Sequence, residues 1–325
     1  MNEAPRWDDD ILPGFSRHDI GLPGAERAPG EPEDVELVAT LVRKDTRLRP
    51  SRRAVLYVHG WNDYFFQAHL ADFWVDRGFD FYALDLRRYG RSLREGHFGG
   101  FVTDLAEYDT ELSAAVDEIR TDHDQVLLMG HSTGGLIGSV WAADNPGRID
   151  GLVLNSPWLD LQATAMVRAL GTPVIDALGT RMATTVLPVS DQGFYARVLH
   201  TRSGGEWDYD LSWKSSPSAA VRAGWLRAVL QGHQRVAAGL AIEVPILVMA
   251  SDRSLFRRKW HDDMRRSDTV LDVSQIAHRA IHLGSCVTVV RIAGGIHDLV
   301  LTAEPVRGRV FSEMARWLRG YAAWY

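Results

Sequence analysis

The sequence predicts an α/β protein with a mostly parallel central sheet and helices on both of its faces. Short apolar runs recur along the chain, and most of them end at a glycine or at a polar residue. Segments with helical periodicity lie between several of these runs, and this alternation favours parallel strands joined by right-handed crossovers. Runs that are apolar at almost every position are typical of strands covered on both faces.

The expected elements follow one another in a regular order. We expect central strands at six apolar runs, which are 54–58, 79–84, 126–129, 152–154, 246–250 and 287–292. We expect helices at five segments, which are 65–76, 104–120, 133–144, 273–283 and 304–318. Two earlier runs, 18–22 and 35–43, flank a loop rich in proline, glycine and acidic residues. We expect these two runs to form an antiparallel hairpin at a sheet edge.

The regular alternation stops between residues 157 and 240. Helical patterns at 161–178 and 218–240 flank a stretch rich in glycine, serine and tryptophan. A segment of this length is too long for a simple loop in a compact domain. We therefore predict an inserted, mostly helical cap at residues 157–240, called the cap below. The core is then formed by residues 1–156 and 241–325.

Composition excludes several classes of protein. The chain has 325 residues and a formal net charge of −6, without the basic stripe of a nucleic-acid-binding protein. Cys286 is the only cysteine, so an internal disulfide is impossible. The N-terminus is acidic and lacks the apolar stretch of a signal peptide, and no run approaches the ~18 apolar residues of a membrane span. We expect a soluble cytoplasmic protein without an integral membrane segment.

The segment 130–134, Gly-His-Ser-Thr-Gly, lies between an expected strand and an expected helix. A serine hydroxyl on such a sharp turn is exposed to a base, and Gly130 and Gly134 allow the backbone to turn without Cβ clashes. The helix that follows favours developing negative charge at its N-terminus. Ser132 is therefore the candidate nucleophile, whereas its neighbour His131 is expected to be structural.

A tetrahedral intermediate needs two preorganised N–H donors. The backbone N–H of Thr133, directly after the nucleophile, is one candidate. The other is the N–H of Trp61, which follows His59 and Gly60 at the end of the expected strand 54–58. Gly60 permits the turn, and we expect His59 to be a hydrogen-bonding structural residue rather than a proton carrier.

The general base is expected late in the chain, after the last strand. His297 follows a glycine pair in a loop at that position and is the candidate base. The third member of such a site is a carboxylate that orients the imidazole and stabilises its cation. Asp252, directly after the strand 246–250, and Asp268 and Asp272 further along are all candidates.

With these residues in place, the chain resembles the α/β-hydrolase superfamily. More narrowly, it is similar to the monoglyceride lipases, lysophospholipases and serine aminopeptidases. The resemblance covers the chain from about residue 35 onward and rests on four motifs, which are His59-Gly60, the segment 85–92 (Asp-Leu-Arg-Arg-Tyr-Gly-Arg-Ser), the segment 131–135 (His-Ser-Thr-Gly-Gly) and His297-Asp298.

The chain departs from the family pattern at a few positions. Arg88 replaces the first glycine of the loop 85–92, which is still expected to form, and Thr133 replaces a methionine. The family places its acid at a distance from the histidine that fits Asp268, 29 positions before His297, better than Asp252, 45 positions before it. The resemblance therefore favours Asp268, with an insertion before it that leaves Asp252 as the alternative.

The resemblance implies acyl transfer through an acyl-enzyme, which requires no metal and no organic cofactor. The expected substrate is a small-molecule acyl ester, such as a monoacylglycerol or a lysophospholipid. Trp158 and Trp213 of the cap are candidate contacts for an acyl chain, although these rings could equally pack the cap onto the core. A serine aminopeptidase is the first alternative, with a substrate ammonium held by Glu206, Asp208 and Asp210. A non-catalytic binding protein on the same fold is the second.

Overall fold

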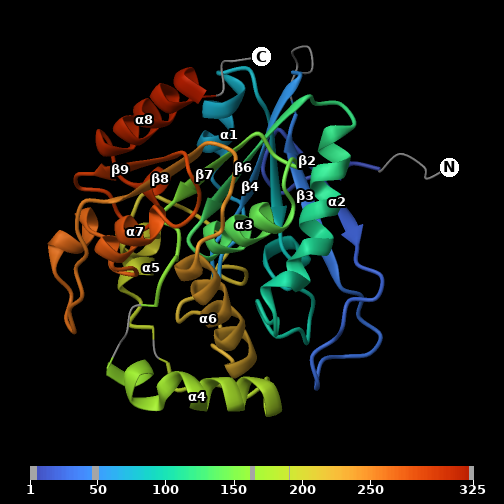
Figure 1. Ribbon diagram of the computed structural model, residues 1–325, viewed down its shortest axis with the longest axis vertical. Helices are drawn as coiled ribbons and strands as arrows, with labels where there is room; N and C mark the ends of the chain where they lie inside the picture. Colours follow the sequence, from blue (N-terminus) through green and yellow to red (C-terminus); the bar gives the residue numbers. More distant parts are fainter. Residues whose placement is uncertain (1–5, 46–50, 162–164, 190, 322–325) are drawn as a thin grey trace.

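The computed structural model describes residues 6–45, 51–161, 165–189 and 191–321. Its described part contains a nine-stranded sheet with the strand order β1-β2-β3-β5-β4-β6-β7-β8-β9 (Figure 1). The strands are β1 (Asp8–Asp9), β2 (Phe15–Gly21), β3 (Val38–Lys44), β4 (Arg53–Val58), β5 (Asp80–Asp85), β6 (Gln125–His131), β7 (Gly151–Asn155), β8 (Ile246–Ser251) and β9 (Val287–Ile292). The α-helices are α1 (Ala68–Val75), α2 (Asp109–Arg120), α3 (Thr133–Asp144), α4 (Ala165–Arg181), α5 (Phe194–Leu199), α6 (Ala223–Ala238), α7 (Val273–Ala280) and α8 (Val306–Tyr321).

Strands β4 to β9 are parallel to one another, and β1, β2 and β3 are added antiparallel at one edge. The mostly parallel sheet and the expected antiparallel hairpin, formed by β2 and β3, are both confirmed. Strand β2 begins at Phe15, earlier than the sequence predicts. The short strand β1 is not predicted at all, because two aspartates carry no strand signal.

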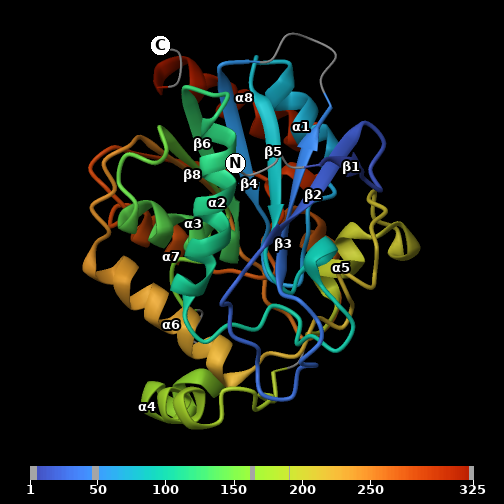
Figure 2. The same cartoon turned by 90° about the vertical axis from the view of Figure 1, so that its right-hand side faces the viewer.

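Each face of the sheet has its own hydrophobic core. Side chains along β4 alternate between the two cores: Leu56 belongs to one, and Val55 and Tyr57 belong to the other. The first core also contains residues of α2, α3, α6 and α7, and the second contains residues of α1 and α8. Figure 2 shows α1 and α8 on one side of the sheet and α2 and α3 on the other. Helices on both faces are therefore confirmed.

Several local predictions differ from the structure. The helix expected at 218–240 is α6, which begins only at Ala223, and the segment expected as one helix at 104–120 starts with a 3₁₀ helix, Leu105–Tyr108, before α2 begins at Asp109. The run 287–292 is predicted to be a central strand, but β9 lies at the edge of the sheet and several of its side chains are half-buried or exposed. The helix predicted to begin at residue 65 begins at Ala68. It starts late because the N–H of Phe65 donates to Asp85, at 2.9 Å, and the N–H of Phe66 donates to Gln67, at 3.0 Å.

The cap lies between β7 and β8 in the sequence and contributes α4, α5 and α6. Helix α4 packs on α6, and α6 packs on α3 beside the sheet (Figures 1 and 2). The helix predicted at 161–178 corresponds to α4, although residues 162–164 lie outside the described residues. Helix α5 was not predicted, because its six residues are too few to show a helical period. The boundaries 157–240 for the cap remain a proposal.

The loop after β5 forms although Arg88 stands where the family has glycine. Arg88 adopts a left-handed backbone conformation with φ of 65°. Its buried guanidinium donates to both carboxylate oxygens of Glu31, at 2.8 and 2.7 Å, and to the carbonyl oxygen of Phe101. Burial alone would raise the pKa of Glu31, but the hydrogen bonds from Arg88 and from the N–H of Phe98 hold that pKa below its ordinary value. The N-terminal loop thus supplies the counter-charge for this substitution.

No helix in the described ranges is both long enough and apolar enough to cross a membrane.

Candidate active site

Ser132 lies at the turn between β6 and α3, with φ of 52° and ψ of −117°. This is an uncommon conformation for a residue with a Cβ atom, and such strain persists only where the surroundings hold it. The N–H of Ser132 donates to the carbonyl oxygen of Asn155 at the end of β7, at 3.1 Å, and the residue is only 6% exposed. The prediction that Ser132 lies at the turn between a strand and a helix is confirmed.

The glycines around Ser132 provide close approach rather than left-handed conformations. A Cβ atom on Gly134 would lie 2.2 Å from the carbonyl oxygen of His59. A Cβ atom on Gly60 would lie 3.0 Å from the Cβ of Ser132. Strands β4 and β6 can therefore bring the loop 59–64 and the serine together only because these positions lack side chains; Gly130 is equally confined.

His297 lies between Ser132 and Asp268. Its Nε2 is 3.0 Å from the Oγ of Ser132, and its Nδ1 is 3.0 Å from the Oδ2 of Asp268. All three side chains are buried. The other carboxylate oxygen of Asp268, Oδ1, accepts the N–H groups of Val270 and Leu271, at 2.8 and 2.7 Å. These two bonds fix the carboxylate, and the carboxylate in turn can fix the imidazole with its Nδ1 protonated.

The other two candidate acids lie elsewhere. The Oδ1 of Asp252 accepts the N–H of Gly294, at 3.1 Å, and Asp272 caps the N-terminus of α7. Asp268 reaches His297 because the chain leaves β8 at residue 252 and then folds back, so that Asp268 lies beside residues 253–255. The N–H of Asp268 donates to the carbonyl oxygen of Arg253, at 3.0 Å, and its carbonyl oxygen accepts the N–H of Leu255, at 2.8 Å.

The two predicted oxyanion donors have N–H groups that bond to no other group of the described chain. The peptide between Gly60 and Trp61 is oriented by His59, whose Nδ1 lies 2.8 Å from the carbonyl oxygen of Gly60. In a planar trans peptide the N–H points away from the C=O, so the N–H of Trp61 is directed opposite to this bond. The N–H of Thr133 belongs to the first residue of α3, where helical N–H groups have no internal partner.

His59 itself is a buried structural residue in this arrangement. Its Nε2 accepts the N–H of Leu86, at 3.1 Å, so His59 joins the ends of β4 and β5. Burial is the main cause that lowers its pKa, and the imidazole is therefore held neutral. With Nδ1 as the donor and Nε2 as the acceptor, both ring nitrogens are used and neither is left for proton transfer.

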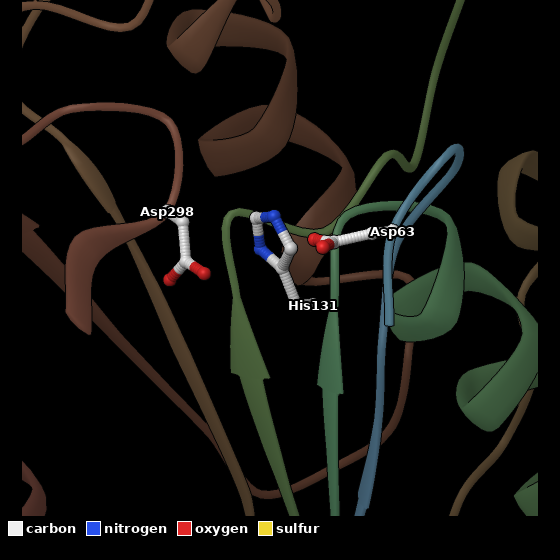
Figure 3. Close-up of side chains that lie close together, drawn as sticks. All are labelled: Asp63, His131 and Asp298. Atoms are coloured by element: carbon white, nitrogen blue, oxygen red, sulfur yellow. The ribbon is translucent and has the colours of Figure 1, made fainter. Parts of the chain in front are cut away.

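A second group of buried side chains lies next to His297. Figure 3 shows the imidazole of His131 between the carboxylates of Asp63 and Asp298. The ligand atoms of these three residues lie within 4.8 Å of one another, a donor set that could suit a divalent cation. However, Lys214 already forms an ion pair with Asp63, at 2.8 Å, and Asn155 donates to Asp298, at 2.6 Å. We therefore assign the group to the internal hydrogen-bond network.

The charges in this network follow from burial and contacts. Burial is the main cause that lowers the pKa of His131 below its ordinary value. Burial alone would raise the pKa of Asp298, but His131 and the hydrogen bonds from Asn155 and Gln67 hold it below its ordinary value. No local pattern predicts this network, apart from the structural role expected of His131.

The two cap tryptophans predicted as substrate contacts differ in their surroundings. The N–H of Trp158 donates to the carbonyl oxygen of Ser132, at 3.0 Å, so Trp158 lies beside Ser132. Its ring lies 5.9 Å from that of Trp225, which in turn lies 3.8 Å from the ring of Trp61. Trp213 instead packs edge-on against Tyr64, at 5.1 Å, and joins the cap to the core.

Asn155 of β7 and two residues of the cap also contribute, and sequence reasoning missed Asn155 and Lys214. Asn155, at the end of β7, bonds both to His131 and to Asp298, and a polar residue ending a buried strand was the available signal. The ring of Tyr195 packs edge-on against His297, at 5.4 Å. Lys214 carried no signal, since a single lysine in a polar stretch usually faces solvent.

His233 contacts the backbone of Trp158, and because its ring is buried we expect the protein to lose stability in acid. Its Nε2 lies 2.9 Å from the carbonyl oxygen of Trp158, and burial lowers its pKa to about 4. The unfolded chain takes up this proton below pH ~6.5 and the folded chain only near pH 4, so stability falls between these values. We expect the burial of His233 to lower the free energy of unfolding by about 2 kcal/mol at pH 5 relative to pH 7.

Urea unfolding of the wild type and of His233→Gln at both pH values measures this cost. The amide of glutamine can still donate to Trp158 but does not titrate, so the variant should lose about 2 kcal/mol less between pH 7 and pH 5. An identical pH dependence in both proteins would show that His233 is not buried as a neutral ring.

Comparison with known proteins gives the family. The profile of the serine aminopeptidase family S33 matches residues 49–256. A monoacylglycerol lipase of Mycolicibacterium smegmatis is 31% identical over 274 residues, which are 82% of this chain and 88% of that protein. A phospholipase of Bacillus subtilis, YtpA, is 36% identical over 112 residues, or 33% of this chain; the match spans only 41% of the phospholipase.

Among solved structures, a monoacylglycerol lipase from Paleococcus ferrophilus superposes with a TM-score of 0.64 and 17% identity, covering 88% of this chain and all of that one. At this identity the likeness shows the fold alone, and it confirms the α/β-hydrolase fold expected from the sequence. Together with the match of the family profile, these findings show that the chain belongs to the serine aminopeptidase S33 family of α/β-hydrolases.

Proposed function

We propose that the chain is a serine hydrolase that cleaves carboxylic esters of single-chain lipids, such as a monoacylglycerol or a lysophospholipid. The observation that carries the proposal is the continuous pair of contacts from Ser132 through His297 to Asp268, each of 3.0 Å. This order of nucleophile, base and orienting acid is the arrangement that activates a serine hydroxyl for acyl transfer.

In the proposed reaction, His297 takes the proton from Ser132 as its Oγ attacks the ester carbonyl carbon. The N–H groups of Trp61 and Thr133 stabilise the oxyanion, and Asp268 stabilises the imidazolium. His297 then gives its proton to the departing alcohol, and the acyl group stays bonded to Ser132 as an acyl-enzyme. A water molecule, deprotonated by His297, then attacks the acyl carbon. The bond between that carbon and the Oγ of Ser132 breaks, and His297 returns the proton to Ser132.

Three tryptophans support a lipid ester as the substrate. The rings of Trp61, Trp158 and Trp225 form a continuous aromatic group beside Ser132, which suits an acyl chain.

The surroundings of the cap carboxylates favour an ester over a peptide. Glu206 is exposed and lies 3.5 Å from Arg307, and the side chain of Asp208 is 87% exposed. The Oδ1 of Asp210 accepts the N–H of Ser212, at 2.7 Å, within its own turn. An aminopeptidase needs a carboxylate beside the scissile bond to hold the substrate ammonium, and none of the three has contacts that suit this role.

Turnover of two matched substrate series tests the proposal. We expect hydrolysis of p-nitrophenyl esters, with kcat/KM rising as the acyl chain is lengthened from two carbons until the aromatic group is filled. We expect no comparable turnover of amino-acyl p-nitroanilides. A preference for the anilides would favour the aminopeptidase, and tight ester binding without turnover would favour a binding protein.

A further inference from the structure

The loop that carries Trp61 is held from the cap by the residue that follows it. The Nδ2 of Asn62 donates to the carbonyl oxygen of Ser215, at 2.9 Å. Its Oδ1 accepts the Oγ–H of Ser215 and the N–H of Ala219, each at 3.0 Å. The backbone of Asn62 has φ of 50°, a left-handed conformation that asparagine tolerates better than most residues. Every one of these side-chain bonds joins the core to the cap.

The next two residues of the loop are bound by the same part of the cap. Asp63 forms its buried ion pair with Lys214, and the hydroxyl oxygen of Tyr64 accepts the N–H of Asp210, at 2.7 Å. Three consecutive loop residues are therefore attached to the segment 210–219. Loss of either partner of this buried ion pair would leave an uncompensated buried charge, so Asp63 and Lys214 depend on each other.

The core and the cap hold opposite ends of Trp61. On the core side, His59 orients the peptide that contains the Trp61 N–H through the carbonyl oxygen of Gly60. On the cap side, the bonds of Asn62 fix the residue that follows. The first contact orients the peptide that carries the N–H, and the second holds the chain on the other side of Trp61.

We propose that Asn62 is a positioning residue through which the cap segment 210–219 completes the oxyanion hole. This inference rests on the function proposed above, in which the Trp61 N–H stabilises the oxyanion. Loss of one oxyanion donor costs ~10²–10³ in kcat, and a misplacement of about 1 Å can cost ~10². Because the donor acts on charge that develops in the transition state, its displacement lowers kcat with little change in KM.

Two substitutions at Asn62 separate the side-chain bonds from the backbone conformation. Asn62→Gly accepts a φ of 50° without strain and removes all three bonds to the cap. Asn62→Asp keeps the two acceptor bonds but places a carboxylate oxygen against the carbonyl oxygen of Ser215. The matched control is Ser212→Ala in the same segment, because the Oγ of Ser212 bonds only to Asp210 and not to the loop.

The experiment measures kcat and KM for a p-nitrophenyl ester, the rate of labelling by a fluorophosphonate, and the melting temperature. We expect kcat and the labelling rate of Asn62→Gly and Asn62→Asp to fall together by ~10- to 100-fold. KM should stay within about threefold of the wild type. Ser212→Ala should match the wild type in every measurement.

Two results would overturn the inference. The first is an Asn62→Gly protein that is labelled and turns over as fast as Ser212→Ala. The second is a raised KM with unchanged kcat, which would make Asn62 a substrate contact. If the wild type is labelled but hydrolyses no ester, the proposed substrate class is wrong and the labelling rates still decide the role of Asn62. A wild type that is not labelled would overturn the proposed nucleophile and this inference with it.

Discussion

Ser132→Ala is expected to lower kcat for ester hydrolysis by ~10⁵- to 10⁶-fold, to the level supplied by the oxyanion donors and by substrate binding alone. Alanine retains the Cβ atom, so the strained φ of 52° is unchanged and only the hydroxyl is lost. The melting temperature should therefore stay within about 4 °C of the wild type, since one lost hydrogen bond is worth ~1 kcal/mol. Steady-state kinetics with a p-nitrophenyl ester measures the loss.

The substrate affinity of this variant is the control. The Trp61 and Thr133 donors and the aromatic group beside the site are untouched, so an uncleaved ester should bind about as tightly as its KM in the wild type indicates. Activity within tenfold of the wild type would mean that another group attacks the substrate, and the proposed mechanism would be wrong.

Asp268→Asn is expected to lower kcat by ~10⁴-fold through the tautomer of His297. The N–H groups of Val270 and Leu271 need an oxygen acceptor at the Oδ1 position, so the carboxamide NH₂ must face the imidazole. The Nδ1 of His297 then becomes an acceptor and its Nε2 carries the proton. A protonated Nε2 cannot accept the proton of Ser132, so the base is blocked although every atom is nearly in place.

Asp252→Asn is the matched control for this prediction. Asp252 also follows β8, and its Oδ1 accepts the N–H of Gly294 in the loop that leads to His297. The carboxamide oxygen can make the same bond, so we expect kcat within about threefold of the wild type. A large loss in Asp252→Asn together with an active Asp268→Asn would transfer the role of the acid to Asp252.

The order of strands and helices, and the places of Ser132 and His297 in the fold, could be predicted because local patterns encode them. Buried parallel strands are short apolar runs, and a serine between two glycines at a strand–helix junction has few other uses. Helix α3 was predicted at its observed limits, Thr133–Asp144. The edge position of β9 was missed because an apolar run looks the same in the centre and at the edge of a sheet.

The choice among the three candidate acids depends on the path of a loop, which no local pattern encodes. Asp252 has the simplest sequence position, directly after β8, yet Asp268 contacts His297 because the chain returns to pair beside Arg253. The role of Trp213 was equally open, since one aromatic ring in a cap can contact a substrate or the core. Its edge-on contact with Tyr64 is a tertiary fact.

The contacts between the cap and the loop 59–64 were the least predictable part of the site. Asn62 and its partner Ser215 are more than 150 positions apart in the sequence, and so are Lys214 and its partner Asp63. Neither residue belongs to a motif, and each would usually be assigned to solvent. Long-range polar pairs of this kind arise only when the complete fold brings two loops together.

The most direct test of the account is to find the residue that a fluorophosphonate modifies. The protein is incubated with the reagent, digested, and the modified peptide is sequenced by mass spectrometry, with Ser132→Ala treated in parallel. The account predicts a single adduct on Ser132 in the wild type and no adduct in the variant. An adduct on another residue, or an unmodified wild type, would contradict the claim that Ser132, His297 and Asp268 form the catalytic site.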